Sequence, residues 1–209
     1  MPHRLSNLET IIFDLGEVVI DLDTDAVIAA FSKLTNGQGK NLRDLIVGTP
    51  HLYQYETGQM SDQEFVNAIN GLIEADISLS DLRYAWNLMI KDVSIKRLEF
   101  MVELMQSHQV LILSNTNAMH EVCFDALIKS KTGKLMRDHS HTAYYSHNIG
   151  FRKPNRDIYE FVVAEQKLNP QKTLFLDDKL ENIESARGVG LKAEQVLFPD
   201  QIFEILVHG

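Results

Sequence analysis

Three short apolar runs occur along the chain, and a polar side chain follows each of them at once. The runs are Thr10 to Phe13, Val110 to Leu113 and Thr173 to Leu176. Continuous apolar runs of this length, bounded by polar residues, are typical of strands that are buried on both faces of a parallel sheet. Helical patterns occupy the stretches between them, and strands that alternate with helices predict an open α/β fold.

The stretch between the first two predicted strands is too long for a single crossover helix. Ser61 and Glu64 have the spacing of a capping box, and Ser80 is placed to begin a further helix. Apolar residues follow each of these starts at helical spacing: first Phe65, Ile69, Leu72 and Ile73, then Leu82, Trp86, Met89 and Ile90.

Two more helices are predicted in the same stretch, near residues 25–35 and 40–47. The whole stretch is therefore helical in pattern, with no run that resembles a buried strand. We expect a small helical subdomain over residues 24–90, inserted into a core domain that residues 1–23 and 91–209 form.

Polar residues stand at the carboxyl ends of all three predicted strands: Asp14, Ser114 and the adjacent pair Asp177 and Asp178. The carboxyl ends of parallel strands open on one edge of a sheet, where ligands bind. Any one of these residues alone is most simply explained as a cap for the following turn. Together they predict one crevice that carries several acids.

Asp177 and Asp178 follow an apolar run directly, so their carboxylates repel each other and lose hydration. Lys153, in the stretch GFRKP, offers a countercharge. With Asp14 added, three acids near one point form an oxygen-rich site suited to Mg²⁺. Ser114 and the backbone N–H groups after it would supply donors for phosphate oxygens. This set of groups favours nucleophilic phosphoryl transfer.

Composition narrows the class of protein. The 209 residues are 44% apolar and 23% charged, as in soluble globular proteins that bury a core. The net charge of −9 argues against a nucleic-acid partner, because clustered Lys and Arg hold phosphate backbones. Cys123 is the single cysteine, which fits a reducing compartment, and no apolar run is long enough for a membrane span. We expect a cytoplasmic protein without a membrane partner.

The order of FDLG, LSNTN, RKP and LDD, with Asn182 after the last, resembles the four motifs of the haloacid dehalogenase-like (HAD) hydrolase superfamily over residues 10–200. The chain is most similar to its small capped sugar-phosphate phosphatases, namely the alpha-D-glucose-1-phosphatase group and, more distantly, the N-terminal phosphatase of epoxide hydrolase. The resemblance implies a Rossmann-like parallel sheet core with an inserted small helical cap subdomain. It also implies a Mg²⁺-dependent phosphomonoester hydrolase that acts on a small-molecule phosphorylated metabolite, a sugar phosphate, with sugar 1-phosphates among the candidates.

The resemblance also assigns roles within the reaction. Asp14 would be the nucleophile that forms an aspartyl-phosphate, and Lys153 would be the second catalytic residue, which steadies Asp14 and neutralises the phosphate. Ser114, Asn115 and Lys153 would bind the phosphate group.

For the metal, the resemblance implies that Asp14, the backbone carbonyl of Gly16 and Asp178 bind Mg²⁺ directly. Asp177 would act through water, and Asn182 would orient the surrounding loop. The adjacent acids argue against a dehalogenase of the same superfamily, since a dehalogenase needs no metal.

Gly16 departs from the commonest pattern, in which an Asp at this position protonates the leaving group. A glycine keeps the metal-binding carbonyl and loses the acid, which also argues against a phosphomutase. The alternative is a catalytically weakened protein that binds phosphate or sugar phosphate without turning it over. Glu17, Asp21 and Asp23 lie nearby in the sequence, but no pattern directs them at the site.

Five further residues have two interpretations. Tyr53, Tyr55 and Glu56 could contact a sugar and Trp86 could stack on a ring, but packing within the cap or exposure at the surface explains them as well. His120 could point into the crevice or lie at the surface.

Overall fold

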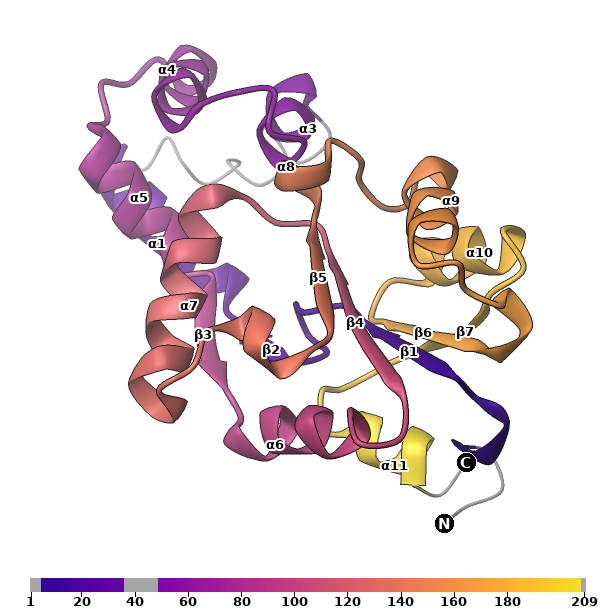
Figure 1. Cartoon of the computed structure of the whole chain (residues 1–209). Coiled ribbons are helices and arrows are strands. Elements are labelled where there is room, and N and C mark those ends of the chain that lie inside the picture. The colour runs from indigo at the N-terminus through magenta and orange to yellow at the C-terminus, as the bar shows by residue number, and fades with distance from the viewer. Residues whose placement is uncertain (1–4, 36–48, 208–209) are drawn as a thin grey trace.

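The computed structural model describes residues 5–35 and 49–207. Its centre is a five-stranded sheet in the order β5-β4-β1-β6-β7, in which every neighbouring pair is parallel (Figure 1). The strands are β1 Thr10–Phe13, β4 Gln109–Ser114, β5 Thr142–Tyr145, β6 Thr173–Asp177 and β7 Lys192–Gln195. The three predicted strands are confirmed as the middle of the sheet, and the predicted α/β fold is confirmed with them.

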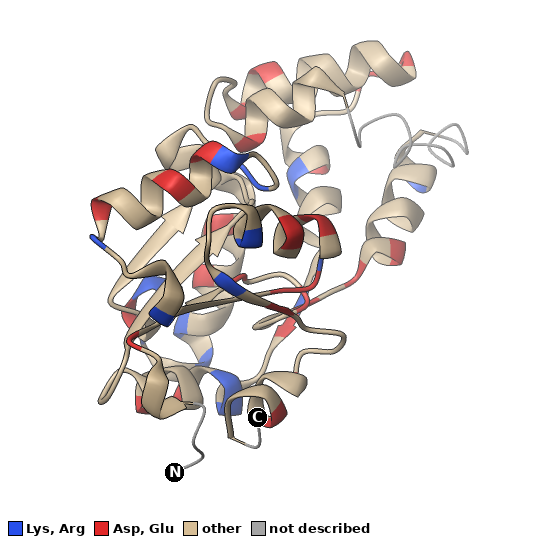
Figure 2. Cartoon of the chain, turned by 90° about the vertical axis from the view of Figure 1, so that its right-hand side faces the viewer, with Lys and Arg blue, Asp and Glu red and all other residues tan. Residues whose placement is uncertain are grey.

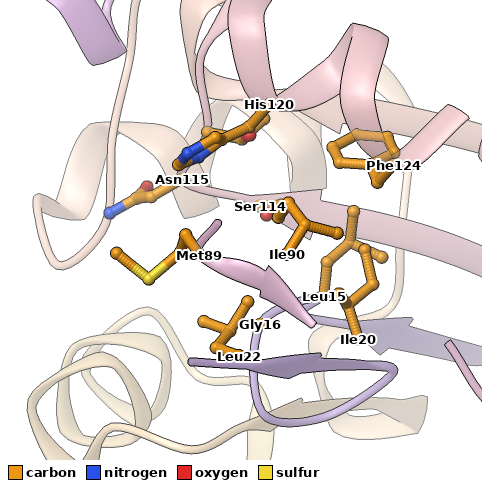
Figure 3. Close-up of a pocket in the computed structure, with 11 residues that line it drawn as sticks. Leu15, Gly16, Ile20, Leu22, Met89, Ile90, Ser114, Asn115, His120 and Phe124 are labelled. Carbon is orange, nitrogen blue, oxygen red and sulfur yellow. The ribbon is translucent and has the colours of Figure 1, made fainter. Parts of the chain in front are cut away.

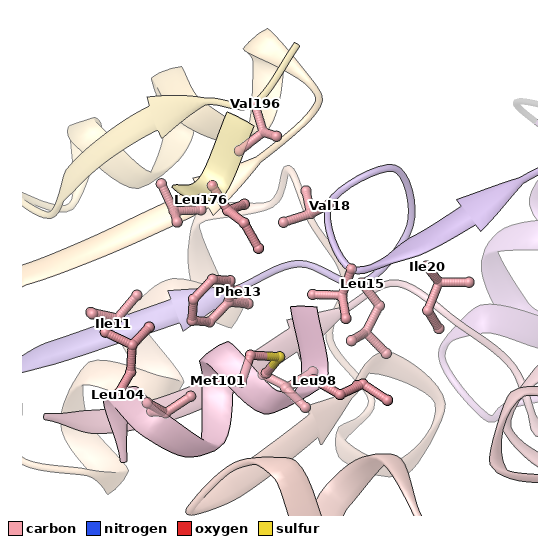
Figure 4. Close-up of a cluster of buried hydrophobic side chains, with 14 of the residues drawn as sticks. Ile11, Phe13, Leu15, Val18, Ile20, Leu98, Met101, Leu104, Leu176 and Val196 are labelled. Atoms are coloured by element: carbon pink, nitrogen blue, oxygen red, sulfur yellow. The ribbon is translucent and has the colours of Figure 1, made fainter. Parts of the chain in front are cut away.

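The side chains of β1 alternate between two faces that helices cover, which explains why its apolar run is continuous. Ile11 and Phe13 pack with Met101 on one face (Figure 4), whereas Ile12 packs with Tyr159 on the other. The helices of the first face are α6 Ile95–Leu104, α7 Ala118–Thr132 and α11 Gln201–Val207, and those of the second are α9 Arg156–Glu165 and α10 Leu180–Gly188.

A second, two-stranded sheet lies beside the parallel one. Its strands are β2, Ile20–Leu22, and β3, Ile90–Val93, which pair in antiparallel fashion. The sequence placed Ile90 in the helix expected to begin at Ser80, and this expectation is wrong. The helix begins after Ser78, whose hydroxyl caps it, and ends before β3. The short strands β2, β3, β5 and β7 carry too few apolar residues for their pattern to stand out.

Four described helices connect β2 to β3: α1 Thr24–Leu34, α3 Pro50–Glu56, α4 Asp62–Ile73 and α5 Leu79–Asn87. Together with Met119 of α7 they form a hydrophobic cluster around Phe65, whose ring stacks on Tyr55 at 4.1 Å and meets Trp86 edge-on at 5.2 Å. The capping box of Ser61 and Glu64 is confirmed. The helix expected near 40–47 lies outside the described residues, and the division into a core and a cap at 24–90 stays a prediction.

Short helices complete the described chain: η1 Leu5–Asn7, η3 Met136–His139, α8 Ser146–Ile149 and η4 Pro170–Lys172. Acidic and basic residues are interspersed along the helices in the view of Figure 2. Within residues 5–35 and 49–207, no helix combines the length and the apolar character that a membrane crossing requires.

The turn after α3 approaches α8 closely. Gly58 has a φ of +70°, and a Cβ at this position would lie 2.1 Å from the backbone oxygen of His147. Only glycine accommodates both the dihedral angle and the approach. The contact bears on the site because the first residue of α8, Ser146, exchanges two hydrogen bonds of 3.0 Å with the backbone of Thr116, just after β4.

Gly58→Ala should lower the free energy of unfolding by roughly 2–4 kcal/mol, since the methyl group meets backbone and the left-handed dihedral becomes costly. The matched control is Gly71→Ala within α4, where nothing lies within 4 Å of the added Cβ. The control should gain roughly 0.5–1 kcal/mol from helix propensity. Denaturant melts of the two variants test this, and equal stabilities would contradict the close approach.

Candidate active site

The register of the parallel sheet brings the polar strand ends together. Phe13 pairs with Ile112 on one side and with Leu176 on the other. Asp14 is therefore level with Asp177, the last residue of β6, and Ser114, the last residue of β4, lies one position further along. The backbone N–H of Asp14 donates to the carbonyl of Leu176 at 2.9 Å and continues this pairing. Asp14, Ser114 and Asp177 are all buried at this edge.

Lys153 reaches this edge from the loop between α8 and α9, and its side chain is 1% exposed. Its ammonium lies 2.8 Å from Asp14 Oδ1 and 2.6 Å from Asp177 Oδ2. A third bond of 2.8 Å runs to the backbone oxygen of Leu113. The three donors of the ammonium are therefore all engaged.

Burial sets the protonation of this group of residues. It raises the pKa of Asp14, and the ammonium of Lys153 works against that rise. Burial alone would lower the pKa of Lys153, but the carboxylates of Asp14 and Asp177 reverse the effect and hold it above its ordinary value. Lys153 is therefore a permanent cation at neutral pH, and it favours the anionic form of Asp14 that a nucleophile requires.

The side chain of Asn115 holds the backbone of Lys153 in place. Asn115 Nδ2 donates to the Lys153 carbonyl at 2.7 Å, and the Lys153 N–H donates to Asn115 Oδ1 at 2.8 Å. The amide oxygen and one N–H of the amide nitrogen are used in this way, and the backbone N–H of Asn115 is a further donor that it can offer to a ligand. This lock between two loops has no signature in the sequence.

Asp177 is 0% exposed, and both of its carboxylate oxygens have partners. Oδ2 binds Lys153, while Oδ1 accepts from Asn182 Nδ2 and from the backbone N–H of Lys179, each at 2.8 Å. The structure thus brings Asn182 to Asp177, and Asp177 binds three neighbouring groups. The orienting role that the resemblance implies for Asn182 stays a prediction.

Asp178 differs from Asp177 because no described residue hydrogen-bonds or pairs with its carboxylate. Ligand oxygens of Asp14, Asp177 and Asp178 all lie within 4.8 Å of one another. Burial and the two neighbouring carboxylates raise the pKa of Asp178 to about 7. A hard divalent cation such as Mg²⁺ fits this all-oxygen set, and it would relieve the repulsion that raises this pKa.

Ser114 and Asn115 also line a small pocket of about 60 Å³ beside Gly16 (Figure 3). No described residue hydrogen-bonds Ser114 Oγ, so this hydroxyl is available to a ligand. Most of the remaining wall is apolar and comes from Leu15, Ile20, Leu22, Met89, Ile90 and Phe124. A Cβ on Gly16 would lie 2.9 Å from Leu22 Cδ1. The position of the missing acid therefore faces an apolar pocket.

The acids that follow Gly16 are engaged elsewhere. Glu17 accepts a hydrogen bond of 3.2 Å from the backbone of Leu22, and Asp21 pairs with Arg97 at 2.7 Å. Asp23 caps α1. None of the three replaces the acid that position 16 lacks.

His120 is buried beside the pocket, contrary to the interpretation that placed it at the surface. Its Nε2 faces the backbone oxygen of Trp86 at 3.0 Å and must donate, which leaves Nδ1 to accept from Asn117 Nδ2 at 3.2 Å. Burial lowers the pKa of His120 to about 4. The ring is therefore neutral at pH 7 and both of its nitrogens are occupied.

The four residues that the sequence offered for sugar contacts fall into two pairs. Tyr55 and Trp86 are buried in the hydrophobic cluster around Phe65. Tyr53 and Glu56 instead meet Arg152, whose Nη2 lies 2.9 Å from Glu56 Oε2 and whose guanidinium carbon lies 5.7 Å from the centre of the Tyr53 ring. The sequence analysis missed Arg152, although its place directly before Lys153 was a usable signal.

Comparison with known proteins agrees with this geometry. The model of the family described as haloacid dehalogenase-like hydrolase matches residues 8–190. A curated relative, D-ribitol-5-phosphate phosphatase of Bacteroides thetaiotaomicron, is 29% identical over 190 residues, which cover 90% of this chain and 91% of that protein.

Two solved structures with different chemistry share this fold. A HAD family enzyme of Bacteroides thetaiotaomicron, in complex with magnesium and inorganic phosphate, has a TM-score of 0.82 at 24% identity and covers 90% of this chain and 93% of its own. L-2-haloacid dehalogenase of Xanthobacter autotrophicus has a TM-score of 0.61 at 17% identity, with 97% and 83% covered. Because both a magnesium complex and a dehalogenase share the fold, the chemistry must be argued from the site.

The two adjacent acids should respond in opposite ways to amidation in metal-free protein. Asp177→Asn should lower the free energy of unfolding by roughly 3 kcal/mol, because it removes one countercharge from buried Lys153. Asp178→Asn should raise the melting temperature, because it removes a repelled carboxylate that has no described partner.

The gain from Asp178→Asn should depend on pH. A carboxyl whose pKa is raised in the folded state costs stability above that pKa, so the gain should be complete above about pH 7 and shrink toward pH 4. Thermal melts across this range, with chelator present, measure both effects. A gain that does not vary with pH would contradict the repulsion.

Proposed function

The chain belongs to the haloacid dehalogenase-like hydrolases and is a phosphatase, and from this premise we propose that it hydrolyses the phosphomonoesters of small sugars or alditols, with Mg²⁺, through an aspartyl-phosphate on Asp14. One observation carries the proposal. A buried lysine holds Asp14 and Asp177 together, while Asp178 beside them has no described partner. The relative that acts on a ribitol phosphate supports the substrate class.

Phosphate binding falls to groups with spare donors at the strand ends. The hydroxyl of Ser114 and the backbone N–H of Asn115 can donate to phosphate oxygens, and Lys153 adds a positive charge close by. We keep the sequence-based assignment of Asn115 to phosphate binding, with its backbone N–H as the donor.

The chemical step is an attack on phosphorus by a carboxylate oxygen of Asp14. A new bond forms between Asp14 and phosphorus, the bond to the ester oxygen breaks, and that oxygen leaves with the electron pair. Lys153 fixes one oxygen of Asp14 and so orients the other. Water then attacks the phosphorus of the aspartyl-phosphate, which releases inorganic phosphate and restores Asp14.

Asp14, Asp178 and the backbone carbonyl of Gly16 would hold Mg²⁺, with Asp177 and Asn182 behind them. When bound, the cation supplies neutralisation of the crowded carboxylates and of the phosphate oxygens. Asp177 is less suited to direct ligation because its oxygens already accept three hydrogen bonds.

Gly16 affects both halves of the reaction. It offers no acid to protonate the leaving oxygen and no base for the attacking water, and neutral His120 has no free nitrogen to replace it. We therefore expect the rate to depend on how well the leaving oxygen tolerates negative charge. Sugar 1-phosphates remain candidates on this ground.

Asp14→Asn should lower turnover by at least about 10³-fold, because an amide is too weak a nucleophile to accept the phosphoryl group. The assay is a panel of phosphorylated metabolites with Mg²⁺ or with chelator, and chelator should silence the wild type. Intact mass spectrometry during wild-type turnover should detect one added phosphoryl group that the variant lacks. Phosphate binding without turnover by the wild type would instead favour the alternative of a binding protein.

A series of phosphate esters should show a steep dependence of kcat on the acidity of the leaving alcohol, with aryl phosphates and sugar 1-phosphates faster than glycerol phosphate. Gly16→Asp should reduce that dependence, but its Cβ requires Leu22 to move. Gly16→Asp with Leu22→Ala makes room for the new carboxyl, and Leu22→Ala alone is the control. A flat wild-type series would show that another group supplies the proton.

A further inference from the structure

A largely buried ion pair joins the last residue of α3 to the loop that carries Lys153. Arg152 Nη2 lies 2.9 Å from Glu56 Oε2, and the two side chains are 25% and 15% exposed. The ring of Tyr53 lies under the guanidinium, and its hydroxyl accepts a hydrogen bond of 3.4 Å from Asn155. The pair therefore has a fixed place between the cap helix and the core.

The pair leaves one donor and one acceptor unused. The close approach of Arg152 and Glu56 lacks the angle of a hydrogen bond, and both Arg152 Nε and Glu56 Oε2 are buried without a hydrogen-bond partner among the described residues. Buried groups of this kind are costly unless something satisfies them. The two side chains as a whole remain 25% and 15% exposed, so a ligand can reach the pair. A hydroxyl group donates and accepts at once, so a single hydroxyl could satisfy both unused groups once the side chains shift enough to expose them.

Glu56 also belongs electrostatically to the catalytic crevice. Burial raises its pKa, and the nearby charges of Arg152, Lys179 and Lys153 work against the rise. Arg152 precedes Lys153 directly, so the backbone that places the catalytic ammonium also places this guanidinium. The pair therefore lies within electrostatic reach of Lys153 at the proposed phosphate site.

We propose that Glu56 and Arg152 form a specificity site that binds a hydroxyl group on the carbon chain of the substrate. This inference rests on the proposed phosphatase function. The carboxylate of Glu56 disfavours a second phosphate or a carboxylate on the substrate, and Arg152 disfavours an amine. The site thus selects neutral polyhydroxylated chains, as in alditol or aldose monophosphates, over bisphosphates and simple alkyl phosphates.

Two substrates with the same leaving group isolate this contact. Ribitol 5-phosphate and pentyl phosphate both release a primary alcohol of five carbons, but only the first carries further hydroxyl groups. The wild type should prefer ribitol 5-phosphate, and Glu56→Gln should lower its kcat/KM for that ester by about 10–100-fold, mainly through KM. The kcat/KM for pentyl phosphate should fall by a much smaller factor, because this ester has no further hydroxyl group for Glu56 to contact.

Arg152→Lys keeps the charge and removes the Nε–H donor, so it should lose selectivity in the same direction. The matched control is Glu160→Gln, which breaks the exposed pair of Arg156 and Glu160 on α9 and should change neither rate. Circular dichroism and thermal melts establish that each variant folds. If Glu56→Gln does not fold, Arg152→Lys decides the question.

Each outcome has one meaning. An unchanged ratio of the two kcat/KM values in both folded variants would overturn the hydroxyl site, as would equal losses on both esters or a wild type without preference. Hydrolysis of pentyl or aryl phosphates would still support the proposed function in those cases. A wild type that hydrolyses no phosphate ester with Mg²⁺ would overturn the proposed function itself.

Discussion

The ammonium of Lys153, buried between two carboxylates, is the interaction on which the rest of the site depends. Removing either carboxylate would take one countercharge from an ammonium whose side chain is 1% exposed, and removing Lys153 would leave two largely buried carboxylates without their cation. The chain secures the arrangement twice, since Asn115 binds the Lys153 backbone and Asn182 binds Asp177. The end of β4, the loop that carries Lys153 and the end of β6 are therefore fixed relative to Asp14 before any ligand arrives.

Among the described residues of the site, negative charges outnumber positive ones, and no acid stands at position 16 to protonate the leaving group. Three clustered carboxylates face one buried ammonium, and the most open of the three, Asp178, carries the unrelieved repulsion. The region beside Gly16 is largely apolar, and both ring nitrogens of His120, which lines it, are already hydrogen-bonded. A bound cation would stabilise a site of this kind by neutralising its carboxylates. The site also favours substrates whose leaving oxygen tolerates negative charge.

The helices between β2 and β3 contact the rest of the chain at two points near the crevice. Gly58 packs against the carbonyl of His147, and Glu56 pairs with Arg152. The two contacts lie two residues apart on the cap side. A change at the end of α3 would therefore alter both the packing of Gly58 and the position of Glu56, which we assign to substrate recognition. Substrate specificity thus depends on how α3 packs against the rest of the chain.

The sequence by itself determined the central strands and the chemistry at their ends. Apolar runs buried on both faces are distinctive, and acids at strand ends have few inexpensive explanations. The sequence therefore singled out Asp14, Lys153, Asp177 and Asp178, which the structure brings together. Only the tertiary structure decided that both ends of the Asn115 amide hold Lys153, that His120 is buried and neutral, and that Arg152 meets Glu56. Those outcomes depend on contacts between residues that are far apart in the sequence. A local sequence pattern does not predict which distant residue will hydrogen-bond a buried polar side chain. The short strands and the end of α5 were missed for a related reason, because pairing with a neighbouring strand outweighed a weak local preference.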